Sequence, residues 1–331
     1  MKRLLLLKTG ALGDIVLTSV SINIAAESFP EYEIYFLTKS QYAKIYKDCP
    51  LIKKIFILPT GKKLFTFLKF LKELRKEKID IIIDLQGNLK TNFLCFLFGG
   101  KKRIGLYKKP LGKLFLTIGV KKKSGLNPIL SQELFWQKIT KKMIAGRLQV
   151  WISDDRKKNF NTFLKKYGLE IEKYVVFHPS ASSEWKTKLW SKDNWTLLAR
   201  FFLGKNLKVV LIGDKNSSIL NSEIAGFAGN NVIDLSGKTD FFTLALLIKN
   251  SITLVTTDSG PMHIGAATGV ETIAIFGPTD PEIHCPPGVK FLKENTSCSP
   301  CYKKNCKYML CMKNISPEKV KEMFKIEKEK N

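Results

Sequence analysis

The sequence predicts an α/β protein built from two doubly wound, Rossmann-like parallel sheets, each in its own domain. With 331 residues, 44% of them hydrophobic, the chain can bury a large core, and its length suits two domains better than one. Short apolar segments rich in β-branched residues alternate with helix-like segments, as in right-handed βαβ units. The composition becomes polar and helix-prone near residue 150, which separates two such series. We therefore expect two sheets facing each other across a cleft.

The first series fills the N-terminal half. A continuous apolar run at residues 4–7 indicates a buried parallel strand, and the spacing of Leu64, Phe67, Leu68 and Leu71 indicates a helix. The expected strands are residues 4–7, 33–37, 55–58 and 79–85, and the expected helices are residues 14–28 and 64–78. The basic, Gly-containing stretches 99–113 and 121–125 are expected to be solvated loops.

The second series follows the composition change. Its expected strands are residues 174–178, 208–212, 232–235, 252–256 and 272–276, and its expected helices are 192–203, 217–228, 240–249 and 262–267. We place the two domains at residues 1–165 and 166–315. A final helix in 316–331 is a candidate to pack back on the first domain.

Charge and hydropathy restrict the classes of protein. No apolar run approaches the roughly 18 residues that would span a bilayer, and Lys8 interrupts the N-terminal apolar run before it resembles a signal peptide. We therefore expect a cytoplasmic protein. The net charge is +26, and residues 1–170 carry 34 basic and 13 acidic side chains of the total. Such a half attracts nucleic acid or an anionic membrane surface; a general drift of surface positions to lysine is the alternative.

The turn at residues 8–14 is the first candidate site. Gly10 and Gly13 allow a tight turn and a close ligand approach, although the spacing is not the dinucleotide fingerprint. Asp14 begins a helix at the carboxyl end of the first strand, the edge that faces the ligand crevice in open α/β sheets. A helix N-cap is the competing interpretation of Asp14.

A hydroxyl-rich turn at residues 178–190 is the second candidate. Ser180 and Ser182, followed by Lys186 and Lys188, offer donors and positive charge that suit diphosphate oxygens. A solvated basic loop is the competing interpretation.

The segment 257–267 is the most informative. A strand ends, Asp258 and Ser259 form a turn, and Gly260 precedes a proline at a position that helices tolerate. The helix start then directs amides and its positive dipole end toward the crevice, which forms an anion site. Asp258 is a candidate for a ribose hydroxyl, and His263 for the diphosphate.

Four of the seven cysteines cluster with the spacing C-x2-C-x4-C-x4-C. They are Cys298, Cys301, Cys306 and Cys311. The spacing is compatible with a structural Zn or Fe–S site, and reduced packing cysteines are the competing interpretation. No catalytic metal is indicated.

Taken together, the motifs resemble the heptosyltransferases, the ADP-heptose:lipopolysaccharide transferases of glycosyltransferase family 9. The resemblance spans nearly the whole chain and rests on K-T-G-A-L-G-D-I-V-L-T at 8–18, D-L-Q-G-N at 84–88, K-L-W at 188–190 after His178-Pro179, L-S-G-K at 235–238 and D-S-G-P-M-H-I-G-A at 258–266. The cysteine segment is also similar to that of many members. Lys8 departs from the family, in which many members carry arginine.

The resemblance implies a GT-B fold and an inverting, metal-independent transfer of a heptose to the lipopolysaccharide inner core. The first domain would bind lipid A–Kdo or a heptosylated core, and the second would bind ADP-heptose. Asp14 matches the general base and Lys188 the lysine on the diphosphate, although extra residues before Lys188 leave Lys186 as an alternative. The implied donor-side residues are Ser180, Ser182, Lys186, Asp214, Asp258, Ser259, Gly260 and His263, and the acceptor-side residues are Gly10, Gly13, Gln86 and Asn88.

The basic half then suits peripheral contact with the anionic inner face of the inner membrane through residues such as Leu111, Leu114, Phe115 and Leu116. Two alternatives stay open. A nucleic-acid- or polyanion-binding protein would explain the charge but not the crevice-edge turns, and the sequence contains no recognisable RNA or DNA module. A sugar-nucleotide 2-epimerase of the same fold would need no acceptor.

Overall fold

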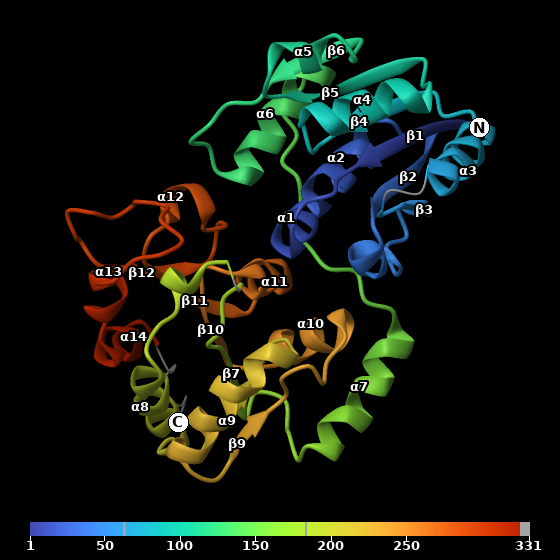
Figure 1. The fold of residues 1–331 in the computed structure, drawn as a ribbon. Helices are drawn as coiled ribbons and strands as arrows, with labels where there is room; N and C mark the ends of the chain where they lie inside the picture. Colours follow the sequence, from blue (N-terminus) through green and yellow to red (C-terminus); the bar gives the residue numbers. More distant parts are fainter. Residues whose placement is uncertain (62–63, 183, 325–331) are drawn as a thin grey trace. The chain divides into compact units, whose positions relative to one another are not determined.

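The computed structural model describes residues 1–61, 64–182 and 184–324. These residues form two compact units, Met1–Ile152 and a second unit that begins at Ser153. Each unit contains one six-stranded parallel sheet with helices on both faces (Figure 1). The expected α/β class with two doubly wound sheets is therefore confirmed.

The first sheet is built from buried apolar strands. Its strands are β1 (Lys2–Leu7), β2 (Tyr32–Lys39), β3 (Ile52–Leu58), β4 (Ile81–Asp84), β5 (Lys102–Tyr107) and β6 (Ile118–Lys121), in the order β3-β2-β1-β4-β5-β6. The four leucines of β1 are fully buried, because a central parallel strand is covered on both faces. The strand order is that of a Rossmann sheet.

Two layers of helices cover this sheet. One contains α1 (Leu12–Leu17), α2 (Ser19–Ser28), the 3₁₀ helix η1 (Ser40–Tyr46) and α6 (Pro128–Thr140), and the other contains α3 (Leu64–Lys76), α4 (Leu89–Phe98) and α5 (Pro110–Lys113). Phe70, Leu71 and Leu74 of α3 are buried with Leu94 and Phe98 of α4 in the core beneath the second layer. These apolar faces attach the helices to the sheet.

The second sheet repeats the same topology. Its strands are β7 (Tyr174–His178), β8 (Lys208–Leu211), β9 (Val232–Asp234), β10 (Thr253–Thr257), β11 (Glu271–Phe276) and β12 (Lys290–Lys293), in the order β12-β11-β10-β7-β8-β9. Counted from β7, this is again the 3-2-1-4-5-6 order of a Rossmann sheet.

Helices of the second unit flank this sheet. They are α7 (Asp154–Lys166), the 3₁₀ helix η2 (Lys186–Lys188), α8 (Lys192–Leu203), the 3₁₀ helix η3 (Lys215–Ser217), α9 (Ser218–Ala228), α10 (Phe241–Lys249), α11 (Gly260–Thr268), α12 (Pro281–His284), α13 (Leu310–Lys313) and α14 (Pro317–Met323). The chain division observed at 152/153 puts α7 with the second sheet, where it contacts α10.

The C-terminal helix packs on the second unit. Val320 and Phe324 belong to the core around α8, and the Phe324 and Phe202 rings lie 4.8 Å apart. Trp190 Nε1 donates to the carbonyl of Ile315 at 2.9 Å. For the described part of α14, the expected return to the first domain is thus wrong; residues 325–331 lie outside the described residues.

Two expectations for the first unit are also corrected. The expected loop at 99–113 contains β5 and α5, and the residues at 118–121 form β6. Ile104 and Leu106 of β5 are buried although lysines and an arginine precede them. The expected helix 14–28 is two helices, α1 and α2, which are separated at Thr18. The Thr18 hydroxyl donates to the Asp14 carbonyl at 2.7 Å, a bond that often bends a helix.

Candidate functional site

The strand order gives each sheet a topological switch point, the place where open α/β sheets bind ligands. In a Rossmann sheet the chain leaves the two central strands in opposite directions, and ligands bind outside their carboxyl ends. In the first unit these strands are β1 and β4, which residues 8–14 and 84–88 follow. In the second unit they are β7 and β10, which residues 178–190 and 258–263 follow. The motifs selected from the sequence therefore lie at the two switch points.

Asp14 is half exposed beside the end of β1. It lies in the first turn of α1, whose N-cap is Ala11, so the interpretation of Asp14 as the N-cap is wrong. Its Oδ2 accepts a hydrogen bond from the Ala11 amide at 3.2 Å, and its Oδ1 lies 3.9 Å from Lys8 Nζ. The carboxylate is 47% exposed and is therefore available to a ligand.

The loop before Asp14 fits only glycine at Gly10. A Cβ at Gly10 would lie 2.4 Å from Asp14 Oδ2, so any side chain there would displace the carboxylate. Gly13 is buried within α1. The loop is joined to the segment after β4, because the Thr9 amide donates to Gln86 Oε1 at 3.1 Å.

Asn88 and Asp84 organise the turn after β4. Asn88 is the N-cap of α4, and its side chain accepts from the Thr91 amide at 2.9 Å. Asp84 is fully buried, and its Oδ1 accepts from the Gln86 and Gly87 amides at 2.9 and 3.0 Å. Burial raises the pKa of Asp84 to about 6 despite these bonds. Asp84 was not assigned a role from the sequence. An Asp that precedes a glycine-containing turn nevertheless often accepts hydrogen bonds from the amides of that turn, as Asp84 does.

Lysines surround Asp14. Lys8 Nζ donates to the Leu85 carbonyl at 3.2 Å. Lys122 lies within range of the charges of Lys8, Lys108 and Asp14, and burial together with the two lysines lowers its pKa. The carboxylate thus lies in a positively charged part of the unit. Lys8 and Lys122 were not among the site residues expected from the sequence.

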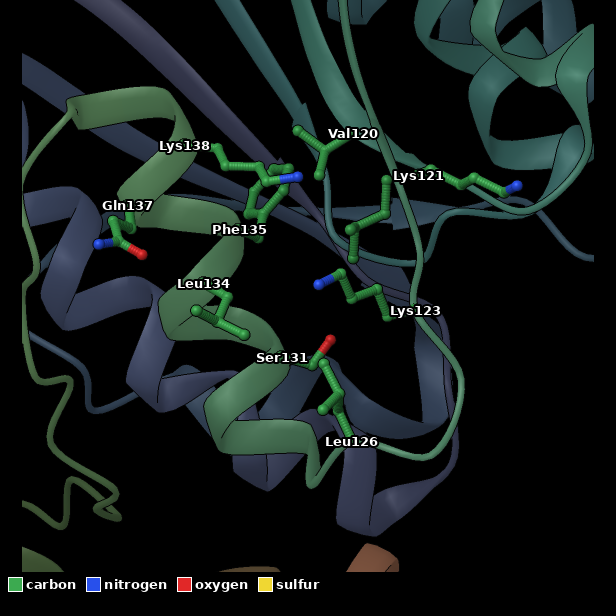
Figure 2. Close-up of a pocket in the computed structure, with 10 residues that line it drawn as sticks. Val120, Lys121, Lys123, Leu126, Ser131, Leu134, Phe135, Gln137 and Lys138 are labelled. Carbon is green, nitrogen blue, oxygen red and sulfur yellow. The ribbon is translucent and has the colours of Figure 1, made fainter.

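A hollow of about 70 Å³ lies between β6 and α6 of the same unit. Figure 2 shows that the Lys123 ammonium group points toward it near Ser131 of α6, and that the Lys138 ammonium group points toward Val120. Apolar side chains such as Leu134 and Val120 line the rest. This arrangement of a cationic rim over an apolar floor suits a ligand with anionic groups.

His178 is the centre of the second switch point. This buried residue ends β7, and its Nε2 lies 3.0 Å from Ser180 Oγ while its Nδ1 lies 3.0 Å from Ser259 Oγ. Burial lowers the pKa of His178 to about 4, so the ring is neutral at pH 7. It joins the turn after β7 to the turn after β10. Sequence reasoning quoted His178 in a motif but gave it no role.

The turn after β10 starts α11. Ser259 is the N-cap of α11, but its hydroxyl does not cap the first turn. The hydroxyl instead contacts the His178 ring and lies 2.9 Å from Thr256 Oγ1. Gly260 is the first helical residue, and His263 follows one turn later. The helix start carries the positive end of the dipole.

Lys188 and Asp258 form a buried ion pair at this point. Lys188 Nζ lies 2.6 Å from Asp258 Oδ2, and the two side chains are 14% and 9% exposed. Thr279 Oγ1 donates to the same oxygen at 2.7 Å. Burial pushes the pKa of Asp258 upward, but Lys188 and Thr279 outweigh it and hold the pKa below its ordinary value. The ammonium also lies 4.6 Å from the centre of the Trp185 ring.

The two candidate lysines occupy different places. Lys186 is exposed and lines a surface hollow with Lys304 and Cys306, whereas Lys188 pairs with Asp258 at the switch point. The structure thus brings Lys188, and not Lys186, beside the start of α11.

The remaining donor-side candidates lie in neighbouring loops. Ser182 is exposed, and its carbonyl accepts from the Trp185 amide at 2.8 Å; Ser183 lies outside the described residues. Asp214 follows β8 and caps η3, where its Oδ1 accepts from the amide and hydroxyl of Ser217 at 3.0 and 2.8 Å. A Cβ at Gly213 would lie 3.3 Å from Ser180 Oγ, so this loop borders the turn after β7.

The four C-terminal cysteines line one cavity of about 390 Å³. Within residues 1–61, 64–182 and 184–324, no three His, Cys, Asp or Glu side chains are arranged to hold a metal ion, so the Zn or Fe–S hypothesis gains no support. Protein contacts hold the segment. The Cys301 amide donates to the Pro278 carbonyl at 3.0 Å, and Thr187 Oγ1 donates to the Lys303 carbonyl at 2.7 Å. It therefore packs directly against η2, which carries Lys188.

Comparisons with known proteins show which family the chain resembles. The family model of glycosyltransferase family 9 (heptosyltransferase) matches residues 67–312. The lipopolysaccharide heptosyltransferase 1 of Pseudomonas aeruginosa is 24% identical, with 96% of both chains covered.

Solved structures share the fold. A family 9 glycosyltransferase from Veillonella parvula matches with a TM-score of 0.84 and 20% identity, covering 97% of this chain and 95% of that one. The E. coli heptosyltransferase WaaC, solved with ADP, matches with a TM-score of 0.73 and 19% identity, covering 97% and 96%. The GT-B expectation is thereby confirmed. Because the family model covers most of the sequence, this chain belongs to glycosyltransferase family 9, the heptosyltransferases, and is a glycosyltransferase.

Proposed function

We propose that this enzyme transfers a heptose from ADP-heptose to the lipopolysaccharide inner core, with inversion of the anomeric carbon and without a catalytic metal. Family membership supports sugar transfer. The name of the Pseudomonas relative supports a lipopolysaccharide acceptor, and the ADP in the WaaC structure supports an adenosine diphosphate leaving group.

The observation that carries the proposal is the cluster at the start of α11. Lys188 is held by Asp258 beside a helix whose N-cap hydroxyl is engaged elsewhere. A lysine and a helix dipole at one switch point are the features that bind a diphosphate. Asp258 and Thr279 fix the position of the ammonium, so the charge is in place before the ligand arrives. Asp258 thus acts as a positioning residue in this proposal, in place of the expected ribose contact.

The second unit would then stabilise the leaving group. As the bond between the anomeric carbon and the diphosphate breaks, negative charge accumulates on the diphosphate oxygens. Lys188, paired with Asp258, and the amides at the start of α11 would offset that charge. Neutral His178 would keep Ser180 and Ser259 in fixed orientations, and the loop with Asp214 would border the nucleoside. Ser182, Gly260 and His263 complete the proposed donor side.

Asp14 is the proposed general base. One of its oxygens is bonded to the helix start and the other faces Lys8 at 3.9 Å, while 47% of the side chain is exposed. As the acceptor oxygen bonds to the anomeric carbon, its hydroxyl proton would move to this carboxylate. A carboxylate is a weak base toward a sugar hydroxyl. That is sufficient, because the hydroxyl becomes acidic only as the new bond forms.

The basic surroundings of Asp14 support an acidic acceptor. Lys8 and Lys122 lie near the carboxylate, and Lys123 and Lys138 line the separate hollow between β6 and α6 (Figure 2). Carboxylates and phosphates of a lipid A–Kdo or heptosylated core would find cations in this unit. Gly10, Gly13, Gln86 and Asn88 would shape the acceptor side by fixing the two loops at the switch point.

We further propose that the first unit binds the acceptor and the second unit binds the nucleotide sugar. The reaction would then take place in the cytoplasm at the anionic inner face of the inner membrane. Among the described residues, no helix is both long and apolar enough to cross a membrane.

The test is a reconstituted reaction. Purified enzyme is incubated with ADP-heptose and lipid A–Kdo, with and without EDTA, and the products are identified by mass spectrometry and by the anomeric coupling in NMR. We expect an acceptor heavier by one heptose, an inverted linkage and no effect of EDTA. A changed sugar nucleotide in the absence of acceptor would instead identify a 2-epimerase. Absence of transfer from a panel of nucleotide sugars would refute the proposal.

A further inference from the structure

The helix layer α3–α4–α5 of the first unit exposes many large apolar side chains. Phe65 is 81% exposed, Leu114 is 75% exposed and Leu64 is 69% exposed. The exposed large apolar residues of this layer are Leu64, Phe65, Leu68, Leu89, Phe93, Phe96, Leu111 and Leu114. Soluble proteins seldom expose so many such side chains together, and concentrations of them mark interaction surfaces.

These side chains belong to one surface. The helices α3 and α4 contact each other, as do α4 and α5, and all three cover the same face of the first sheet (Figure 1). Their inward residues, such as Leu71 and Leu94, are already buried in the core. The rings of Phe93 and Phe96 pack against Phe115 at 5.2 and 6.0 Å, which joins α4 to the segment after α5. We call the eight exposed residues the apolar layer surface.

A hollow of about 400 Å³ opens on this surface. Leu64 and Phe67 of α3 line it together with Phe93 and Leu97 of α4. Lys90 is the charged residue among the described residues that line it. An apolar hollow with a cationic edge has the chemistry of a site for an acyl chain below an anionic headgroup.

The charge around the apolar layer surface is almost entirely positive. Lys69, Lys72, Lys90 and Lys113 are exposed on the three helices, and all residues of these helices are described. Glu73 is their one acidic residue. Basic side chains beside exposed Phe and Leu are typical of proteins that lie on anionic bilayers.

We propose that the apolar layer surface docks the enzyme on an anionic lipid bilayer, with Phe65 and its neighbours inserted at the headgroup level and the lysines on the anionic headgroups. This inference rests on the proposed function, because docking would keep the enzyme at the membrane that holds its proposed acceptor. It corrects one part of the expected contact: Leu111 and Leu114 are exposed, but Leu116 is in the core.

Two other occupants fit less well. A second copy docked by the same surface would place lysines against lysines, and like charges facing each other across an interface cost free energy. A nucleic acid would use the lysines but would leave the aliphatic leucines in water. A bilayer satisfies both the charge and the apolar side chains.

The experiment is co-sedimentation of the full chain with vesicles of phosphatidylcholine, with and without phosphatidylglycerol. We expect binding to the anionic vesicles that weakens in salt. The variant F65S/L68S removes two exposed side chains and should lower the partition about tenfold or more, because each buried CH₂ group contributes several-fold. Its matched control is I219S/F227S on α9, where the two residues are 74% and 58% exposed. The control should bind as the parent does.

The outcomes separate this proposal from the proposed function. Equal loss in both variants, no binding to anionic vesicles, or a concentration-dependent dimer that F65S/L68S abolishes would each overturn the docking proposal. Transfer to a detergent-solubilised acceptor is measured alongside. If transfer persists without vesicle binding, only the docking proposal fails; if vesicle binding persists without transfer, only the proposed function fails.

Discussion

The two sheets share one topology but arrange charge differently at their switch points. The first unit presents Asp14, half exposed and bounded by lysines. The second holds a buried pair, Lys188 and Asp258, beside a neutral His178 that bonds to two serines. A preorganised buried site suits a ligand of fixed chemistry such as a diphosphate. An exposed carboxylate suits an acceptor molecule that must bind, react and then dissociate with one more sugar attached. The same fold thus supports two kinds of site.

The largest expected effect separates chemistry from binding. Asp14→Asn keeps an oxygen for the Ala11 amide but removes the proposed general base. We expect turnover to fall by roughly 10²–10⁴-fold, the range for a positioned general base, while ADP affinity is unchanged. Steady-state kinetics and calorimetric titration with ADP measure the two quantities. Unchanged turnover would show that Asp14 is not the general base and only supports the start of α1.

The second effect tests the buried site. Lys188→Ala should weaken ADP binding by about 1.5–3 kcal/mol, the contribution of a charged hydrogen bond. Lys186→Ala is the matched control, because this exposed lysine lies two residues away and outside the switch point. Calorimetric titration gives both affinities. A larger loss in the Lys186 variant would move the diphosphate site to that lysine.

The third prediction concerns pH and contrasts the two units directly. Burial lowers the pKa of His178 from 6.5 to about 4, so its stabilising contribution is complete above pH 6.5 and is lost as the pH falls toward 4. Burial raises the pKa of Asp84 from 3.8 to about 6, so its contribution is complete below pH 3.8 and is lost as the pH rises through 6. The two groups therefore act in opposite directions, by at most about 3 kcal/mol each.

Urea unfolding of the parent, His178→Gln and Asp84→Asn between pH 4 and 7 measures this contrast. Relative to the parent, His178→Gln should lose less stability on acidification, and Asp84→Asn should lose more. If both variants followed the parent in parallel across this range, neither group would have the shifted pKa described above.

The smallest effect tests the brace behind Lys188. Thr187→Val removes the hydrogen bond from Thr187 to the Lys303 carbonyl and should lower stability by about 1 kcal/mol, with a severalfold weaker ADP affinity. Thr196→Val removes a hydrogen bond from Thr196 to the Lys192 carbonyl within α8 and is the matched control, with ADP affinity unchanged. Equal ADP affinity in both variants would show that the cysteine segment does not position η2.

Much of this structure was accessible from the sequence. Five of the six strands described in the second unit were predicted to within one or two residues, because buried parallel strands read as short apolar runs between turns. The edge strand β12 was not expected. The switch-point loops were found because glycines, hydroxyls and carboxylates follow those runs. β5 was missed because basic residues at 101–103 precede its short buried part. The packing of α14 on α8 could not be predicted, because it depends on contacts between segments that are distant in the sequence.

The roles of individual site residues were less predictable. His178 contacts Ser259, which lies 81 positions later, and Lys188 contacts Asp258 across 70 positions. Only the sheet order brings these side chains together. Likewise, Lys122 comes near Asp14 through β6, a strand that the sequence did not reveal.

Each sheet in this enzyme has a core of its own, and the chain changes from one unit to the other at residues 152 and 153. A graft at that junction would therefore leave every buried contact within both halves intact. Joining residues 153–331 to the N-terminal half of another glycosyltransferase is accordingly a practical route to hybrid enzymes. If the second unit binds the nucleotide sugar as proposed, such hybrids would combine new acceptors with an unchanged nucleotide preference.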